Sequence, residues 1–328
     1  MSTVAHLNPT IKPQRRYSAL EVRIEALRDL FRRLWKNPSA RVGGFLVVAT
    51  TLIGVFVPLL DNYNPLKDGD LKAKYATPDC IVGWISSQLN DTEKLSLSDM
   101  ACVHPFGADK NGRDILRRVG HGMSVSLAVG IFVVVISVTV GASIGLAAGF
   151  LSGWFESVSM RMMDVILAFP SLLLAIALVT VAGASLTNGM IAIAITQIPT
   201  FARLTRSMAI SIRNTEYVVA ARSVGANGLS IMRDHVLPNS LAPLIVQSTL
   251  MLGTAVIETA ALGFLGLGQQ PPFPELGKML AESQPALASG KWWLMVFPGV
   301  TIVLIVLGFN LMGDALRDAL DPRLRGTD

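Results

Sequence analysis

Residues that could carry acid–base, metal or nucleotide chemistry are few in this sequence and widely scattered. The four histidines are His6, His104, His121 and His235. They lack the close spacing of a metal-binding motif. The P-loop pattern GxxxxGK[ST] is also absent, because Met279 follows Lys278 and Trp292 follows Lys291. We therefore predict that this chain is not an enzyme and binds no metal or cofactor. If ATP and Mg²⁺ are used, a partner chain must bind them.

Two ionisable residues fall inside apolar runs and are candidates for function within a membrane. Glu258 lies in the stretch AVIETAALGF, and Asp164 lies in RMMDVILAFP. A charge at mid-bilayer is costly, so such a residue either lines a polar pathway or hydrogen-bonds a neighbouring helix. Both interpretations stay open from the sequence. One glutamate is too little for a proton relay, which argues against a proton-driven carrier.

These residues lie within or between long apolar runs. Of the 328 residues, 51% are hydrophobic and 16% are charged, whereas soluble domains carry about 25% charged residues. Runs of about 20 apolar residues predict transmembrane helices, because a helix satisfies its own backbone polar groups in lipid. We predict an all-α polytopic membrane protein with six transmembrane helices, at residues 41–60, 124–150, 158–182, 188–204, 241–265 and 292–312.

The distribution of basic residues predicts the orientation of these spans. Residues 1–41 carry nine Lys or Arg against three acids, and residues 203–239 carry five Arg against two acids. Basic loops face the cytoplasm, so we predict that both termini and residues 203–239 are cytoplasmic and that residues 61–123 form an external loop. The net charge of +5 is mostly this topology signal. The basic residues flank spans without interleaved aromatic residues, which argues against nucleic-acid binding.

The first 40 residues form a basic leader with amphipathic spacing. Apolar residues recur at helical spacing with arginines between them: Leu20, Ile24, Leu27, Phe31, Leu34 and Trp35, with Arg23, Arg28, Arg32 and Arg33. This pattern predicts an amphipathic helix that lies on the inner membrane surface, in contact with the lipid bilayer. Packing against the cytoplasmic loops of the protein is the alternative.

Small residues and prolines indicate where the spans pack closely or bend. Gly141, Gly145 and Gly149 repeat every four residues in the second span, and such a stripe permits close approach of another helix. The partner could be a helix of this chain or of another subunit. Pro170 interrupts the hydrogen-bond ladder inside the third span.

Residues 216–239 read EYVVAARSVGANGLSIMRDHVLPN and lie between two apolar runs. The first part is rich in alanine and compatible with a helix, and Gly225 and Gly228 permit a sharp turn. A second short helical stretch follows, and we expect Pro238 to end it before the fifth span. Ala220 and Ala221 present a surface with little side chain. A small-residue helix of this kind is shaped to enter a groove of another protein.

This segment resembles the cytoplasmic signature loop of binding-protein-dependent ABC importer permeases. That family has Glu-Ala-Ala, three residues, Gly, nine residues, Ile, one residue and Leu-Pro. The matching positions here are Val219, Ala220, Ala221, Gly225, His235, Leu237 and Pro238. Val219 stands where the family has Glu, and His235 stands where it has Ile. The identity of the acidic contact therefore stays open, with Glu216 as a candidate.

Further blocks resemble the dipeptide/oligopeptide-type permeases of that family. They are HPFGADKNGRDILRRVGHG, HVLPNSLAPLIV, ETAALGFLGLGQQPP and FNLMGDALRDALDPRL. The resemblance covers about residues 30–324 apart from the external insertion. It implies a cytoplasmic N-terminal segment (1–40), an extra first transmembrane helix (41–60), an external loop insertion (61–123), a permease core (124–312) with a cytoplasmic coupling loop (205–239), and a cytoplasmic tail (313–328).

The resemblance also implies partners. In such importers two related permease subunits form the pathway, two cytoplasmic ABC ATPases each grip one signature loop, and an extracytoplasmic solute-binding protein delivers solute. This chain would then lie in the bacterial inner membrane and supply half of the pathway. The residues implied to contact the ATPase are Glu216, Tyr217, Ala220, Ala221, Gly225, Ala226, Leu237 and Pro238.

The implied solute is a dipeptide or oligopeptide. The same architecture importing nickel, glutathione or another small solute is the alternative, because the residues that line the pathway are not readable from the sequence. Two other classes are an intramembrane enzyme and a membrane scaffold without transport activity. An enzyme would need paired catalytic residues on facing spans, and the sequence offers only isolated acids.

The only two cysteines, Cys80 and Cys102, both fall in the loop predicted to be external. Disulfides persist in oxidising compartments, and a bridge closing a loop of about 20 residues would stabilise it by roughly 3 kcal/mol. Two unpaired thiols are the alternative.

Overall fold

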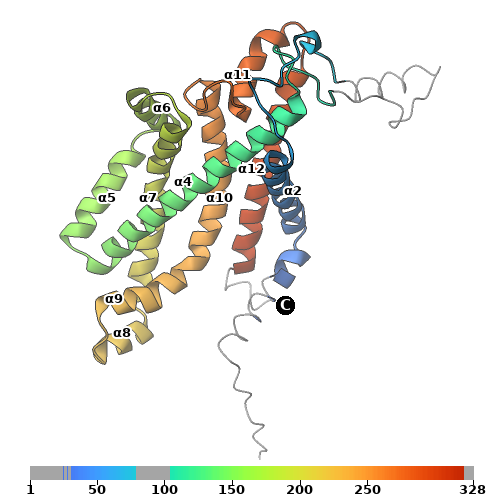
Figure 1. The fold of residues 1–328 in the computed structure, drawn as a ribbon. Coiled ribbons are helices and arrows are strands. Elements are labelled where there is room, and N and C mark those ends of the chain that lie inside the picture. The colour runs from blue at the N-terminus through green and yellow to red at the C-terminus, as the bar shows by residue number, and fades with distance from the viewer. Residues whose placement is uncertain (1–24, 26–27, 29–30, 79–103, 321–328) are drawn as a thin grey trace, which may run out of the picture.

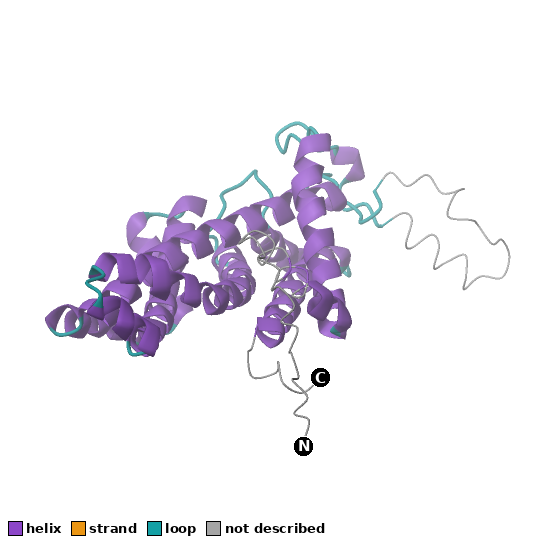
Figure 2. Cartoon of the chain, turned by 90° about the horizontal axis from the view of Figure 1, so that it is seen from below, coloured by secondary structure: helices purple, strands orange, loops and turns teal. Residues whose placement is uncertain are grey.

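Helices make up almost all of the regular structure in the computed structural model, which describes residues 25, 28, 31–78 and 104–320 (Figure 2). Within those residues, one isolated bridge joins Ala108 to Asp114. Residues 31–36 are helical. The elements that follow are α2 (Pro38–Leu60), the short 3-10 helix η1 (Leu71–Ala73), α4 (Ile115–Leu151), α5 (Trp154–Leu167), α6 (Ser171–Ala182), α7 (Leu186–Arg213), α8 (Glu216–Ser223), α9 (Gly228–Ile231), the π-helix η3 (Met232–Val236), α10 (Leu237–Phe264), α11 (Leu276–Leu287) and α12 (Trp293–Leu320).

Several helices begin at residues that satisfy their free backbone N–H groups. The Asn37 side chain accepts from the Ser39 N–H at the start of α2, with Pro38 in the first turn. Asp114 accepts from the Arg117 N–H to cap α4. Such caps fix where a helix starts, and here they place polar residues at the ends of the long apolar helices.

The fold confirms an all-α polytopic protein in which an extra N-terminal helix precedes the core. By length and composition, the helices that could cross a membrane are α2, α4, the continuous helix from Gly228 to Phe264, and α12. The bent pair of α5 and α6 would make a fifth. The 28-residue helix α7 is long enough, at about 1.5 Å per residue, but it is not among the candidates by composition. The crossing of the membrane by α7 therefore stays a prediction.

The predicted third span is not one straight helix. Its two halves, α5 and α6, meet at an angle of 91°. Pro170 precedes the first residue of α6 and has no N–H to continue the ladder from α5. The residue before a proline is also driven away from helical conformation, so the chain turns at Phe169. The predicted interruption at Pro170 is confirmed as a sharp corner.

Three helices extend beyond the ends of the predicted spans. Residues 115–123, assigned to the external loop, form the start of α4. Residues 205–213, assigned to the coupling loop, are the last turns of α7, and α12 runs on to Leu320 instead of ending at 312. Hydropathy marks the stretch in contact with lipid, whereas a helix continues past it wherever packing and caps support the backbone.

The predicted glycine stripe packs α4 against α7 within this chain. A methyl group at Gly141 would lie 2.6 Å from the Ile198 carbonyl oxygen, and one at Gly145 would lie 2.3 Å from the Ala202 carbonyl oxygen. Such backbone approach requires glycine. This contact identifies the partner that the sequence left open, and it fixes how α7 lies along α4.

The loops gather at two opposite ends of the helices (Figure 1). One end carries α8, α9, residues 31–36 and the close of α12. The other end carries η1, the start of α4, and α11. The described part of the N-terminal segment therefore lies at the same end as the predicted coupling loop.

Candidate functional site

The segment between α7 and α10 is the strongest candidate for function, and its first helix ends in a defined turn. Just after α8, the Gly225 N–H donates to the Arg222 carbonyl at 3.0 Å, and the Ala226 N–H donates to the Ala221 carbonyl at 3.0 Å. These two bonds form a Schellman motif. Gly225 adopts φ +89°, which side chains other than glycine tolerate poorly. The turn predicted at Gly225 is therefore present, and its conformation requires glycine.

The segment is held to the transmembrane helices by a small apolar cluster. Val218 of α8 is fully buried and packs with Ala209 and Ile212 of α7. Ile231 and Val236 complete the buried part of the cluster from the other side of the turn. Phe150 and Leu146 of α4 pack against it. A force on α8 would therefore reach the ends of α4, α7 and α10 together.

The other face of α8 is open to solvent and carries small residues beside the larger exposed side chains of Tyr217 and Val219. Ala220 and Gly225 are exposed, and Ala221 is half-buried. A side chain at Gly225 would meet nothing within 4 Å. Val224, next to it, is 86% exposed. An exposed valine beside a bare Ala/Gly surface is suited to contact with another protein, because small residues let a partner approach the backbone closely.

Two further residues implied for coupling, Glu216 and Tyr217, lie in the first turn of α8. Glu216 is exposed in the first turn of α8, where a carboxylate also favours the helix dipole. The Tyr217 ring lies 5.8 Å from the His235 ring, and its hydroxyl lies 3.5 Å from the Asn239 amide. Tyr217 thereby connects α8 to the start of α10. No group here is arranged for bond-breaking chemistry.

We predicted that Pro238 ends a helix before the fifth span, and this prediction was wrong. The chain runs without a break from α9 through η3 into α10, and Pro238 lies in the first turn of α10. A π-helical turn precedes it, in which the Leu237 N–H donates to the Met232 carbonyl. This wider turn absorbs the proline, which has no N–H to donate. The coupling segment is thus continuous with α10.

Glu258 lies in a buried polar cluster where α6, α7 and α10 meet. Its carboxylate accepts a hydrogen bond from the Ser171 hydroxyl at 2.7 Å, and its side chain is 7% exposed. Its second oxygen and both amide atoms of the buried Gln197 make no hydrogen bond among the described residues. The contact with Ser171 satisfies the interhelix interpretation, and the unpaired atoms leave a role in the pathway open.

Asp164 is more exposed than its place in an apolar run had indicated. Its side chain is 55% exposed, and it forms an ion pair with Arg203 of α7 at 2.5 Å. Glu156 of α5 pairs with Arg206 of α7 one turn further on, also at 2.5 Å. These two pairs join α5 to α7 along an open polar groove. Asp164 can therefore hold α5 against α7, and it takes no part in the Glu258 contact with α6.

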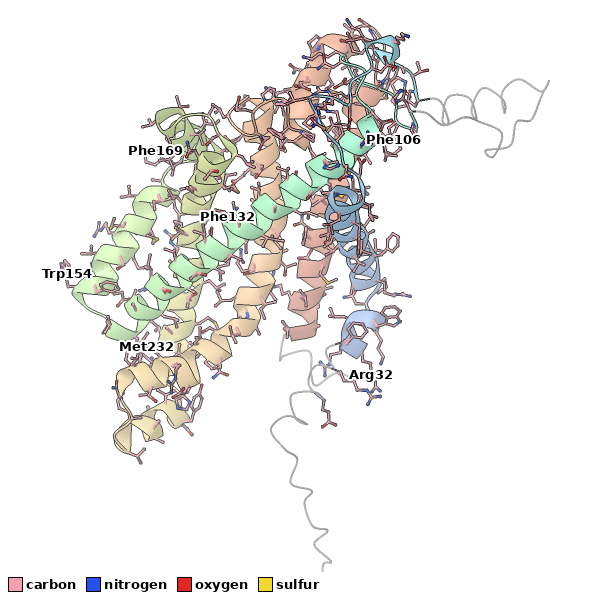
Figure 3. The ribbon with its side chains drawn as sticks, viewed as in Figure 1. Arg32, Phe106, Phe132, Trp154, Phe169 and Met232 are labelled. Atoms are coloured by element: carbon pink, nitrogen blue, oxygen red, sulfur yellow. The ribbon has the colours of Figure 1, made fainter. Side chains whose placement is uncertain are left out.

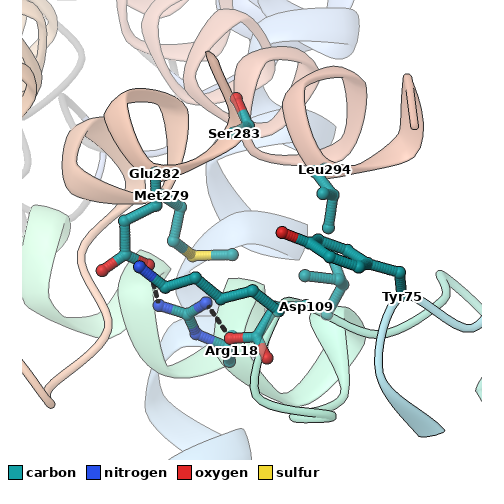
Figure 4. Close-up of a pocket in the computed structure, with 9 residues that line it drawn as sticks. Tyr75, Asp109, Arg118, Met279, Glu282, Ser283 and Leu294 are labelled. Carbon is teal, nitrogen blue, oxygen red and sulfur yellow. Dashed lines mark hydrogen bonds and ion pairs between the residues drawn. The ribbon is translucent and has the colours of Figure 1, made fainter. Parts of the chain in front are cut away.

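A buried ion network lies at the end of the helices opposite α8 (Figure 4), and the sequence analysis did not predict it. Asp109 accepts from Arg113 at 2.7 Å and from Arg118 at 2.5 Å, and Arg118 also donates to Glu282 of α11 at 2.9 Å. All but Glu282 are at most 5% exposed. The two arginines and two acids balance in charge, which is what burial of ions requires. The network fastens the start of α4 to α11.

The predictions on a disulfide and on metal binding concern the residues that remain. Cys80 and Cys102 lie outside the described residues. Among the described residues, no group of three or more His, Cys, Asp or Glu side chains is arranged to hold a metal ion.

Comparison with known proteins gives consistent matches along the whole chain. Residues 138–326 match the family described as binding-protein-dependent transport system inner membrane component. Residues 26–78 match the N-terminal TM domain of oligopeptide transport permease C. Together these two matches include both the coupling segment and the helix α2 that precedes the core.

Several curated relatives are similar over most of their length. The chain is 42% identical over 313 residues to a dipeptide transport system permease protein of Alkalihalophilus pseudofirmus, covering 95% of this chain and 94% of the relative. It is 51% identical over 220 residues to a di/tripeptide transport system permease protein of Pseudomonas aeruginosa, covering 67% and 72%. It is 39% identical over 323 residues to a glutathione transport system permease protein of Salmonella typhimurium, covering 98% and 97%.

A solved structure supports the fold. A chain of the MetNI methionine ABC transporter, in an inward-facing conformation, superposes with a TM-score of 0.51 at 19% identity. The match covers 62% of this chain and 97% of that chain. At this identity the likeness concerns the fold alone.

Proposed function

The chain belongs to the family of binding-protein-dependent transport system inner membrane components, and we propose that it forms half of the pathway of a peptide importer driven by a separate ATPase. It is a multi-pass permease subunit of an ABC importer, not an enzyme. Such permeases act with ATPase and binding-protein partners. In this proposal the complex holds a second related permease subunit, two ATPase subunits that bind ATP and Mg²⁺, and an extracytoplasmic solute-binding protein.

The observation that carries the proposal is the position of the exposed α8 face. Its bare Ala220 and Gly225 surface points away from the helices, while Val218 on the other side is locked into the ends of α4, α7 and α10. A partner that grips the exposed face can move three helix ends as one body. In the proposed mechanism, ATP-driven closure of the ATPases moves α8, and α7 and α10 carry the motion to the pathway.

The motion of α7 and α10 would be transmitted to the bent pair of α5 and α6. Glu258 on α10 accepts a hydrogen bond from Ser171 at the first residue of α6, next to the 91° corner. Arg203 and Arg206 on α7 are paired with α5. Movement of α7 and α10 therefore acts on both arms of the corner. We propose that alternating access changes the position of this corner beside the pathway.

For the solute, we propose small peptides. The relative with 42% identity over 95% of this chain is named for dipeptides, and the one with 51% identity over a shorter stretch is named for di- and tripeptides. Glutathione is the second candidate, because a glutathione permease is 39% identical over 98% of this chain. Glutathione is itself a tripeptide, so one pathway chemistry could serve both.

We also propose the orientation of the chain in the inner membrane. Residues 31–36, α8 and the end of α12 lie at one end of the helices (Figure 1), and the first two belong to segments 1–41 and 203–239, in which Lys and Arg outnumber acids. By the positive-inside rule this end faces the cytoplasm. The end with α11 and the ion network then faces the solute-binding protein.

Competition for uptake tests the solute. The assembled complex, with its binding protein, is placed in proteoliposomes, and ATP-dependent uptake of a labelled dipeptide is measured against unlabelled dipeptide, tripeptide, glutathione and Ni²⁺. The proposal predicts that the peptides compete at lower concentration than glutathione and that Ni²⁺ does not compete. Inhibition by glutathione or Ni²⁺ at lower concentration than by the peptides would contradict the proposed solute while leaving the coupling mechanism intact.

A further inference from the structure

A groove lined almost entirely by apolar side chains runs between residues 31–36, α2 and α12. It encloses about 530 Å³. Phe31 and Trp35, whose rings stack at 6.1 Å, form one wall. Phe45 of α2 and Met312 of α12 line the opposite part, and Arg41 is the single charged residue in the lining.

The groove lies on the outer side of the helix bundle. Among the long helices, α2 packs against α12 and α4, and Figure 1 shows it at the margin. The outward side chains Phe45, Val48 and Leu52 are 72%, 57% and 49% exposed. Both α2 and α12 are candidate membrane spans. The groove therefore opens onto the region that lipid chains occupy.

Five exposed basic residues lie in or next to the stretch of chain that forms one end of the groove. They are Arg28, Arg32, Arg33, Lys36 and Arg41. Among the described residues, none of the five forms a salt bridge. Figure 3 shows Arg32 at this end, beyond the start of α2. Acids also occur here in the sequence, as Glu25, Asp29, Asp314 and Asp318, but none of them lines the groove.

From this arrangement we propose that the groove binds one anionic phospholipid. The phosphate lies at Arg41 and Arg32, and an acyl chain follows the apolar wall past Phe45. Trp35 lies at the level where the lipid acyl chains meet the headgroups, a position that tryptophan favours in membranes. A transmembrane helix of a second subunit could fill the apolar wall but would leave the cations unpaired. The charge at the mouth therefore favours a lipid.

Native mass spectrometry of the full-length chain in detergent tests the site. The chain is mixed with phosphatidylglycerol or phosphatidylcholine of matched acyl chains. We expect one retained phosphatidylglycerol, preferred over phosphatidylcholine. Each basic residue near an anionic surface contributes about 1 kcal/mol, or about five-fold in affinity. Arg41→Gln should therefore lower phosphatidylglycerol retention about five-fold, and Arg41→Lys should keep most of it.

A second variant and a control separate the site from general basicity. Ala49→Phe fills the groove without changing charge, and we expect it to lower retention of both lipids. Lys72→Gln removes a cation at the other end of the molecule and should change neither. Equal retention of the two lipids, or unchanged retention in Arg41→Gln and Ala49→Phe, would overturn the proposal. So would a photo-crosslinker at Val48 that captures a subunit helix instead of lipid in membranes of the assembled complex.

Discussion

The close contact between α4 and α7 gives a prediction whose magnitude follows from the geometry. A methyl group at Gly145 would lie 2.3 Å from the Ala202 carbonyl oxygen and 2.9 Å from the Arg206 nitrogen. Ordinary contacts between heavy atoms are about 3.5 Å, and backbone atoms of a packed helix cannot turn aside. Gly145→Ala must therefore push α7 away from α4. Such overpacking costs about 1–3 kcal/mol, and we expect the upper part of that range because both nearest atoms are backbone.

Gly130 in the same helix is the matched control. A methyl group there would have its nearest neighbours at 3.5 Å, so Gly130→Ala adds ordinary contacts and removes a helix-interior glycine. That change stabilises by up to about 1 kcal/mol. Gly145→Ala gains the same helix propensity, so the difference between the two variants isolates the clash. We expect that difference to be about 2–3 kcal/mol, with Gly145→Ala the less stable.

The assay is the apparent midpoint of thermal unfolding of the purified chain in detergent, at one scan rate for all variants. A difference of this size should separate the two midpoints by roughly 5 °C. Peptide uptake by the complex should also fall with Gly145→Ala, because α7 carries the coupling segment. Equal midpoints for Gly145→Ala and Gly130→Ala would refute the reasoning that the glycine stripe fixes α7 on α4.

Four further predictions test the proposed roles of single groups. Ala220→Glu should abolish uptake and ATPase binding but leave the unfolding midpoint unchanged, whereas Ala184→Glu, at an exposed position of the other end, should retain uptake; uptake by both variants would refute the docking role. Glu258→Gln should retain uptake and Glu258→Leu should lose it while ATPase activity persists, if the carboxylate acts by hydrogen bonding to the start of α6; equal uptake by both variants would refute this. Burial raises the pKa of Glu275 from 4.5 to about 7, so the folded state holds the proton more tightly than the unfolded state. The free energy of unfolding should therefore fall by roughly 3 kcal/mol as pH rises from 4.5 through 7. Glu275→Gln should flatten this pH dependence, and an unchanged pH profile in the variant would contradict this explanation. The isolated chain should not be labelled by an azido-ATP analogue, and saturable labelling that ATP competes away would show that it binds nucleotide.

Much of the coupling segment could be predicted because its signals are local. A left-handed turn after α8 needs glycine, and Gly225 supplies it within ten residues of the helix start. Pro170 similarly predicts the corner between α5 and α6, since a proline has no N–H to donate. The stripe containing Gly145 predicts close packing, although its partner α7 became known only from the fold. Short-range backbone chemistry is thus readable along the sequence.

The extents and the partners of the helices could not be predicted in this way. Hydropathy does not report the helical turns of α4 and α7 beyond the apolar stretch, because caps and packing extend them. The π-turn before Pro238 depends on how α10 meets the coupling segment. Arg118 and Glu282 are 164 residues apart, so their ion pair follows from tertiary packing alone. The unpaired Glu258 oxygen likewise became visible only when α6, α7 and α10 came together.

In the proposed mechanism, a separate ATPase binds the exposed face of α8. A photo-crosslinking amino acid at Val224, which is 86% exposed beside that face, tests this in the assembled complex. The control is the same amino acid at Val181, which is 91% exposed near the other end of the helices. We predict a covalent adduct with an ABC ATPase from Val224 and none from Val181. A complex that imports peptide while Val224 captures no ATPase would contradict the account.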